Sequence, residues 1–244
     1  MPDQYFSRAV EKAMLALESI RRSPQPLSLM EVSSVLGLTK ASAFRLLYTL
    51  EALHYLCKTN DGRYFAPPPT AHRDLLRVGV EPLERLGLEF CETASMAALF
   101  ENHVEVLAVF ESKQLMRMTN TPGRILPPNA SSLGKAVTAF QPAEISEKLV
   151  RSYGTHRFTP NTITDEIELR KEFARIREQG FAEDQEESVN GARCFGAPIL
   201  EPNGTAIGAV SLSLPLIRFR GKDQREMILK SVRKTARAIE TRLN

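Results

Sequence analysis

Three consecutive prolines, Pro67 to Pro69, constrain the fold of this chain more than any other feature. A proline run continues neither a helix interior nor a central strand, because proline lacks a backbone N–H and has a fixed φ. The chain has 244 residues, enough for one large domain or two smaller ones. We therefore predict that the prolines end a first domain over residues 1–67.

The composition is that of a globular protein. Apolar residues make up 43% and charged residues 25%, which excludes the disordered and fibrous classes. No apolar run approaches the ~18 residues of a membrane helix, and the N-terminal residues show no apolar core of a secretory signal. We therefore expect a cytoplasmic protein with no membrane partner.

The three cysteines, Cys57, Cys91 and Cys194, are odd in number and far apart. This pattern excludes a disulfide framework and a CxxC-type zinc site. His54 lies close to Cys57, but two ligands do not make a metal site. We expect neither a metal nor a cofactor.

Apolar periodicity predicts two helices at the start of the first domain. The apolar face of the first helix consists of Val10, Ala13, Met14, Leu17 and Ile20. Ser28 and Glu31 have the spacing of a capping box, which predicts the start of the second helix, and Gly37 ends it. The residues of this second helix predicted to point inward are Val32, Val35 and Leu36.

A third helix and a hairpin complete the first domain. Thr39 is a suitable N-cap for the third helix. The buried stripe predicted for it is Ala43, Leu46, Leu47, Leu50 and Leu53. Asp61-Gly62 lies between two short β-prone segments and predicts a hairpin, because both turn residues need positive φ. This order of elements is that of a winged helix-turn-helix.

The outward face of the third helix carries residue types that bind DNA. Lys40 and Arg45 can contact phosphates or guanine, and Phe44 can contact a thymine methyl group. Lys58 and Arg63 flank Asn60 at the tip of the hairpin. The predicted DNA-binding residues are Lys40, Ala41, Ser42, Phe44, Arg45, Lys58 and Arg63, and Tyr48 and Thr49 share the outward face.

The placement of the charges, rather than the net charge, supports DNA binding. The whole chain carries only +3, and residues 1–69 contain eight Lys and Arg against six Asp and Glu. Four of those eight cations lie on the predicted DNA face. Two alternatives remain: a three-helix scaffold with an ordinary solvated face, and a helix-turn-helix that binds protein.

The chain after the prolines has a mixed α and β pattern. Residues 70–93 are mostly of helical type, with interruptions at Gly79 and Pro82. Strands are predicted over 104–110, 113–118, 192–200 and 205–214. Helices are predicted over 142–152, over 165–179 after Thr164, and over 222–243. An α+β class with two domains follows.

Several sequence blocks resemble the IclR-type bacterial transcriptional regulators. They include LSLMEVSSVLGLTKASAFRLLYTLEALHYL and DGRYF in the head, then LPPNASSLGKA, RFTPNTIT, GFAEDQEE, ARCFGAPI and SLSLP in this order. The resemblance implies a DNA-binding head (1–67), a helical linker (68–93) and a GAF-like effector-binding domain with an antiparallel sheet (94–244). It also implies a homodimer or dimer of dimers on a palindromic operator. The linker is several residues shorter than is usual in the family.

The resemblance further implies a regulator of a catabolic operon that senses a small carboxylate or related metabolite. The effector-binding residues carried over by motif position are Leu115, Met118, Ser132, Leu133, Asp184, Ala192, Cys194, Ser211 and Ser213. The residues themselves agree in part, because Ser211 and Ser213 are two apart in a strand and face the same side. The start of the helix after NASSLGK can offer free N–H groups to an anion.

Other readings of these residues remain open. Cys194 is a candidate small buried hydrophobe, and Asp184 in its acidic run is a candidate solvated residue. A hydrolase would need Cys194 as nucleophile with His156 as base and Asp184 as orienting group, without a nucleophile-elbow pattern. A thiol redox sensor would lack a resolving cysteine. We expect that the protein is not an enzyme.

Overall fold

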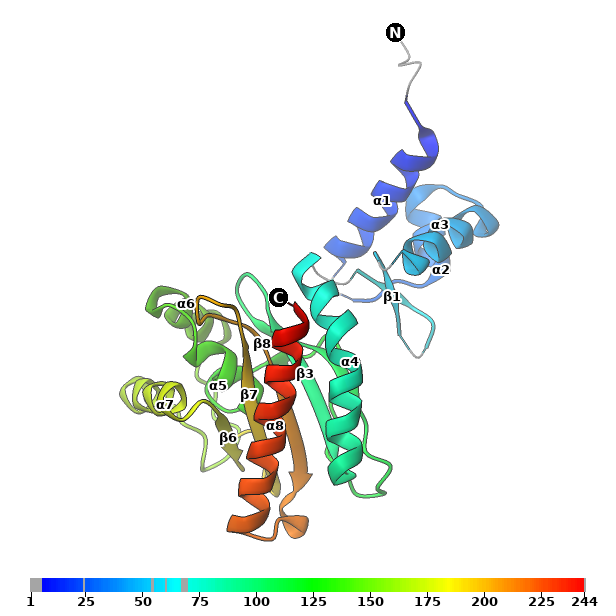
Figure 1. The fold of residues 1–244 in the computed structure, drawn as a ribbon. Helices are drawn as coiled ribbons and strands as arrows, with labels where there is room; N and C mark the ends of the chain where they lie inside the picture. The colour runs from blue at the N-terminus through cyan, green and yellow to red at the C-terminus, as the bar shows by residue number, and fades with distance from the viewer. Residues whose placement is uncertain (1–5, 24, 54, 60, 67–69, 244) are drawn as a thin grey trace. The chain divides into compact units, whose positions relative to one another are not determined.

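The structure is a computed structural model that describes residues 6–23, 25–53, 55–59, 61–66 and 70–243. His54, Asn60 and the three prolines of the sequence analysis lie outside the described residues. The chain divides into two compact units, residues 1–73 and 74–244 (Figure 1). This division lies within the segment predicted as a linker.

The first unit is a winged helix-turn-helix. Its helices are α1 (Arg8–Arg22), α2 (Leu29–Leu36) and α3 (Lys40–Ala52), and its wing pairs β1 (Cys57–Lys58) with β2 (Tyr64–Phe65) in antiparallel register. The three helices and the wing surround one small core. The buried residues of that core are Ala16, Leu17, Ile20, Val32, Leu36, Leu47, Leu50, Leu56 and Tyr64.

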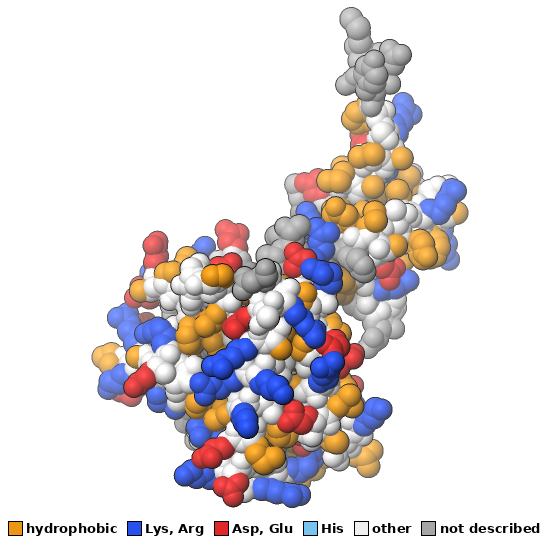
Figure 2. Space-filling view, in the orientation of Figure 1, with side chains coloured by type: hydrophobic (Ala, Val, Ile, Leu, Met, Phe, Trp, Pro, Cys, Tyr) orange, Lys and Arg blue, Asp and Glu red, His pale blue; other side chains and the backbone are white. Residues whose placement is uncertain are grey.

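Four residues predicted to be buried in this unit are exposed. Val10 and Met14 in α1 are 60% and 57% exposed, and Val35 and Leu53 are similarly exposed. Hydrophobic side chains are visible on the surface of this unit in Figure 2. The core residues of α1 all belong to its second half, from Ala16 on. Periodicity identifies the apolar face of a helix but not how much of its length a small core covers.

The second unit contains a six-stranded antiparallel sheet with the strand order β5-β4-β3-β8-β7-β6. The strands are β3 (Thr93–Leu99), β4 (Val104–Phe110), β5 (Ile125–Leu126), β6 (Ala182–Gln185), β7 (Ala192–Leu200) and β8 (Ala206–Pro215). The predictions for β4, β7 and β8 are confirmed, and β3, β5 and β6 were not predicted. The prediction of a strand over 113–118 is wrong, because this segment forms a bend with most side chains exposed.

Helices cover both faces of this sheet (Figure 1). One face packs against α4 (Thr70–Phe90, of which residues from Asp74 on belong to this unit) and α8 (Lys222–Leu243), around a core that includes Met96, Phe195 and Leu212. The other face packs against α5 (Ser132–Ala139) and α7 (Glu166–Gln179), with α6 (Ala143–Tyr153) beside them. The predicted α+β class with an antiparallel sheet in the C-terminal domain is confirmed.

The predicted interruptions of α4 at Gly79 and Pro82 are not present. Pro82 lies inside the helix and cannot donate a hydrogen bond to the carbonyl of Val78. The guanidinium of Arg242 in α8 donates to this carbonyl instead, at 3.3 Å. At Gly79 a Cβ atom would come within 2.5 Å of the Met96 sulfur, so glycine permits the close contact between helix and sheet. Tertiary packing thus compensates for both residues.

The start of α7 differs by one residue from the prediction. The N-cap is Asp165 rather than Thr164, because the Asp165 carboxylate accepts hydrogen bonds from the N–H groups of Ile167 and Glu168, both at 2.9 Å. A carboxylate at this position also interacts favourably with the helix dipole.

Candidate functional site

The turn between α2 and α3 is fixed by local hydrogen bonds. Ser28 and Glu31 form the predicted capping box, with the Ser28 N–H donating to the Glu31 carboxylate at 2.6 Å. Gly37 ends α2 with φ of +59°, where a Cβ atom would be strained. The Ser33 hydroxyl donates to the Leu38 carbonyl at 2.6 Å. These contacts hold α3 in a defined position against α2.

The outward face of α3 matches the prediction. Lys40, Ala41 and Arg45 are exposed, Phe44 is 46% exposed, and Ser42 is half-buried. Within the described chain, neither Lys40 nor Arg45 forms an ion pair with a carboxylate. The Phe44 ring stacks on the Tyr48 ring, with centroids 6.1 Å apart. The face therefore combines two exposed cations with a stacked aromatic pair.

The two cations of the wing have different surroundings. The Lys58 ammonium is exposed and lies 4.9 Å from the centre of the Tyr64 ring. The Arg63 guanidinium contacts the carboxylates of Glu31 at 3.2 Å and Asp61 at 3.4 Å, and it donates to the Pro26 carbonyl. Arg63 therefore ties the wing to the start of α2, and its charge is already balanced.

In the second unit, polar side chains cluster on the sheet face that α5 covers. Strand pairing places Asp184 of β6 beside Cys194 of β7, Cys194 beside Ser213 of β8, and Ser213 beside Thr93 of β3. Ser211 lies two residues from Ser213 on the same side, next to Ser95 of β3. The alternating residues Val210, Leu212 and Leu214 belong to the opposite core, as predicted.

The N-terminus of α5 lies directly against this face. A Cβ atom at Gly196 of β7 would be 2.8 Å from the Ser132 carbonyl oxygen, so only glycine permits the observed approach. Ser132 and Leu133 are both buried here, and the Ser131 side chain caps the helix by accepting from the Gly134 N–H at 2.9 Å. The predicted residue Ser132 of α5 therefore lies close to Gly196, two residues after the predicted Cys194 in β7.

Two residues predicted on the 113–118 segment have different positions. The Thr93 hydroxyl donates to the Met118 carbonyl at 2.6 Å, which brings Met118 next to the polar face. Leu115 is completely exposed and makes no wall of a site in this structure. Ala192 is buried on the same strand side as Cys194. Thr93 and Ser95 join the face although they were not predicted; their alternation matches that of Ser211 and Ser213.

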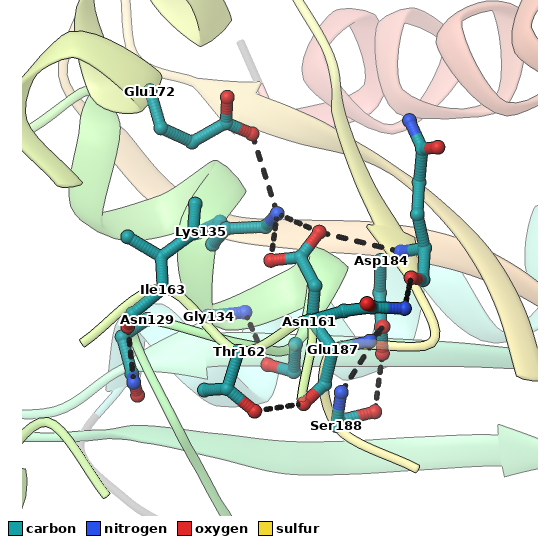
Figure 3. Close-up of polar contacts among 12 residues, drawn as sticks. Asn129, Gly134, Lys135, Asn161, Thr162, Ile163, Glu172, Asp184, Glu187 and Ser188 are labelled. Atoms are coloured by element: carbon teal, nitrogen blue, oxygen red, sulfur yellow. Dashed lines mark hydrogen bonds and ion pairs between the residues drawn. The ribbon is translucent and has the colours of Figure 1, made fainter. Parts of the chain in front are cut away.

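A buried charged cluster borders this face, and the sequence analysis missed it (Figure 3). The Lys135 ammonium is fully buried and lies 2.6 Å from a Glu187 carboxylate oxygen and 3.3 Å from Glu172. The Asp184 carboxylate accepts from the N–H groups of Glu187 at 2.7 Å and Ser188 at 3.2 Å. Burial raises the pKa of both Asp184 and Glu187. The only sequence signal was a lysine within an otherwise apolar helix.

The surroundings of Cys194 argue against a reactive thiol. Burial raises the pKa of the Cys194 thiol, and the neighbouring Asp184 charge raises it further. A thiolate is the nucleophilic form, so this pKa shift lowers reactivity. The His156 ring contacts Tyr153 edge-on, with centroids 6.0 Å apart. In the described chain no hydrogen bond joins that ring to Cys194 or Asp184.

A cavity with a volume of about 150 Å³ lies elsewhere, between α6 and α7. It is lined by Ser146, Glu147, Val150, Arg151, Glu166, Leu169, Arg170 and Phe173, none of which was predicted to bind the effector. Among the residues with described positions, no group of three or more His, Cys, Asp or Glu side chains is placed to hold a metal ion. None of the described helices is long and apolar enough to cross a membrane.

Comparison with known proteins identifies both units. Residues 9–59 match the model of the IclR helix-turn-helix domain, and residues 70–241 match that of the bacterial transcriptional regulator IclR C-terminal domain. The HTH-type transcriptional repressor AllR of Klebsiella pneumoniae is 31% identical over 252 residues, covering 98% of this chain and 91% of the relative.

Solved structures show the same fold. The Thermotoga maritima IclR structure has a TM-score of 0.65 at 23% identity, covering 96% of this chain and 98% of that one. An IclR homologue from Microbacterium hydrocarbonoxydans complexed with 4-hydroxybenzoate has a TM-score of 0.65 at 22% identity, with the same coverage. The chain thus belongs to the IclR family of bacterial transcriptional regulators, with a DNA-binding head and a C-terminal effector-binding domain.

Proposed function

We propose that the protein represses or activates a catabolic operon in response to a small carboxylate bound on the polar face of its second unit. The observation that carries this proposal is the convergence of Asp184, Cys194 and the two β8 serines below the N-terminus of α5. Hydroxyl groups and helix N–H groups are suitable donors for a carboxylate. The proposed site residues are Met118, Ser132, Leu133, Asp184, Ala192, Cys194, Ser211 and Ser213, to which we add Thr93 and Ser95.

One comparison supports a small organic acid as the effector class, because the Microbacterium homologue holds 4-hydroxybenzoate. The curated relatives are repressors, which favours repression as the mode of regulation. No enzymatic step is assigned, because the Cys194 thiol has a raised pKa and the His156 ring contacts Tyr153 instead. As a regulator that binds the chromosome, the protein acts in the cytoplasm.

For DNA recognition we propose that α3 enters the major groove with Lys40, Ala41, Ser42, Phe44 and Arg45, and that Lys58 contacts a phosphate. Arg63 has a lesser share in DNA binding, because two carboxylates already balance its charge. We further propose a homodimer or dimer of dimers, with residues 68–93 as the linker, because a palindromic operator requires two-fold symmetry.

The test of the effector site is the double variant Ser211→Ala/Ser213→Ala. Each lost hydroxyl removes ~0.5 to 1.5 kcal/mol of binding to a neutral ligand atom, and more to a carboxylate. We therefore expect effector affinity to fall by roughly tenfold to several hundredfold. Small aromatic and aliphatic acids, 4-hydroxybenzoate included, are first screened by thermal shift against the parent.

Two titrations of the double variant then separate the outcomes, one with duplex alone and one with duplex and the screened acid. Without effector, DNA affinity should stay within about twofold of the parent, because the two serines belong to the second unit and the predicted DNA-binding residues to the first. A retained effector response would show that the serines are structural and that the site lies elsewhere. A loss of DNA binding without effector would show that β8 supports the DNA-binding assembly itself.

A further inference from the structure

A buried lysine joins two segments that border the proposed effector site, the start of α5 and the turn 184–188. Lys135 lies in the first turn and a half of α5, and its backbone N–H donates to the Ser131 carbonyl at 2.9 Å. Its ammonium group is completely buried. Glu187 accepts from it with both carboxylate oxygens, at 2.7 and 2.6 Å, and lies three residues after Asp184. The Lys135 side chain thus connects α5 to the turn that carries Asp184 (Figure 3).

The contacts continue from Glu187 to Asp184 through the backbone. The Glu187 N–H donates to the Asp184 carboxylate at 2.7 Å, and a Glu187 carboxylate oxygen accepts from the Gln185 N–H at 3.3 Å. The Thr162 hydroxyl donates to the Glu187 carbonyl at 2.6 Å. The turn 184–188 is therefore held at both its side chains and its backbone. The position of the Asp184 carboxylate depends on where Glu187 lies.

The charges around Lys135 show that Glu187 is its main partner. Glu172 of α7 lies 3.3 Å from the ammonium, but Arg175 also pairs with Glu172 at 2.8 Å. Arg175 thus shares the charge of Glu172. Glu187 has no other cation within ion-pair distance in the described structure. Removal of the lysine would leave the Glu187 carboxylate buried without a cation, which strongly disfavours its present position.

We propose that Lys135 is a positioning residue that holds the turn 184–188, and with it Asp184, against the N-terminus of α5, so that the effector site is formed before the effector binds. The inference rests on the proposed function for the meaning of the site. Whether the turn 184–188 stays in place against α5, however, can be measured without any effector.

The experiment uses Cys194 as a reporter inside the site. In the full-length Cys57→Ser/Cys91→Ser background, Cys194 is the single thiol. Its alkylation rate by N-ethylmaleimide reports how often the turn 184–188 separates from α5 and exposes the thiol. The test variant is Lys135→Met, which keeps the length of the side chain and removes the charge. The matched control is Lys171→Met, because Lys171 also pairs with a glutamate, Glu168, at 2.8 Å, but on the exposed surface of α7.

If the proposal holds, Lys135→Met raises the alkylation rate of Cys194 by about tenfold or more through local opening. Lys171→Met changes it by less than about twofold, as expected of an exposed ion pair. The faster rate should not depend on urea at low concentration, because local opening exposes little surface. A rate that rises with urea from the start would show global destabilisation and would overturn the proposal, as would a rate equal to that of the parent.

A second variant keeps the test decisive if Lys135→Met does not fold. Glu187→Gln removes the other charge of the pair and should also accelerate alkylation, while Lys135→Met/Glu187→Gln should bring the rate back toward the parent because no buried charge is left unpaired. A double variant that alkylates faster than either single variant would contradict the ion-pair argument. Failure of the Ser211→Ala/Ser213→Ala test would move the effector elsewhere without changing these rates, so the two failures are distinguishable.

Discussion

At the residue scale, Asp184 combines a buried position with three local hydrogen bonds. Its carboxylate accepts from the N–H groups of Glu187 and Ser188 and contacts the Ser188 hydroxyl. The hydrogen bonds lower the pKa of Asp184, but burial outweighs them and raises it. The proposed effector site therefore contains a carboxyl group that resists ionisation. In its protonated form this group can donate a hydrogen bond to an anionic ligand.

The raised pKa of Asp184 predicts a pH-dependent effect of Asp184→Asn. Between the unfolded pKa, about 4, and the raised folded value, the folded protein binds more protons than the unfolded chain. The contribution of Asp184 to stability is thus full below about pH 4 and is lost as the pH rises through the folded pKa. Asparagine keeps the acceptor oxygen and does not titrate.

We therefore expect the melting temperature of Asp184→Asn, relative to the parent, to increase from pH 4.5 to pH 8. The measurement is a series of thermal melts of the parent and the variant side by side at each pH. A difference that stays constant across this pH range would show that Asp184 titrates normally.

Arg45 carries the most specific prediction for the head. It is exposed on α3 and has no carboxylate partner in the described chain. If it contacts a guanine with two hydrogen bonds, Arg45→Ala weakens operator binding by ~1 to 3 kcal/mol and leaves binding to random duplex much less affected. The measurement is a pair of titrations at one salt concentration. Operator binding as tight as in the parent would mean that α3 does not read the DNA sequence.

At the scale of elements, two glycines position the two sites. Gly37 has a positive φ that permits the turn between α2 and α3, and Gly196 permits the close contact between β7 and the start of α5. The wing is a two-stranded hairpin with only two paired residues on each strand. A hairpin this short is marginal alone. The contacts of Arg63 with Glu31 and the Pro26 carbonyl therefore stabilise its position beside α2.

We expect different effects when the two cations of the wing are replaced by alanine. Lys58→Ala should weaken binding to operator and to random duplex alike and reduce the slope of log affinity against log salt by about one, because one phosphate contact is lost. Arg63→Ala should change this slope less, because its guanidinium is already paired with Glu31 and Asp61. It should instead destabilise the first unit. Equal loss of salt slope in both variants would show that Arg63 leaves its carboxylates to bind DNA.

At the scale of the whole molecule, each unit has its own core. The sheet of the second unit is buried between α4 and α8 on one face and α5 and α7 on the other. Among the described residues, the buried core of the first unit is formed by side chains of α1, α2 and α3 together with Leu56 and Tyr64. Because stability depends on burying such cores, the two units should fold separately.

A fragment of residues 70–244 tests this separation. We expect it to unfold in one cooperative transition, to bind the same acid as the full chain in thermal-shift measurements, and to have no affinity for DNA. Circular dichroism in the near ultraviolet checks that its core is packed. A fragment that aggregates or lacks a cooperative transition would show that the second unit needs the first.

The sequence by itself determined the local features. Ser28 with Glu31, Gly37 and Thr39 define their helix boundaries through contacts within a few residues, which is why they were predictable. Alternation also placed Ser211 and Ser213 on one side of β8. The strand β3, rich in alanine, was missed, because its stability comes from burial between β4 and β8 rather than from β-forming residues.

Only the tertiary structure decided which residues meet. The Val78 carbonyl, which Pro82 leaves without its helical donor, accepts a hydrogen bond from Arg242, 160 residues after Pro82 in the chain. Lys135 and Glu187, separated by 52 residues, form a pair that no local pattern indicates. Exposure of Val10 and Leu115 likewise depends on how far the folded core extends. Hydrogen bonds between near neighbours are encoded in short patterns, whereas buried charges and covered surfaces depend on contacts that form only when distant segments pack together.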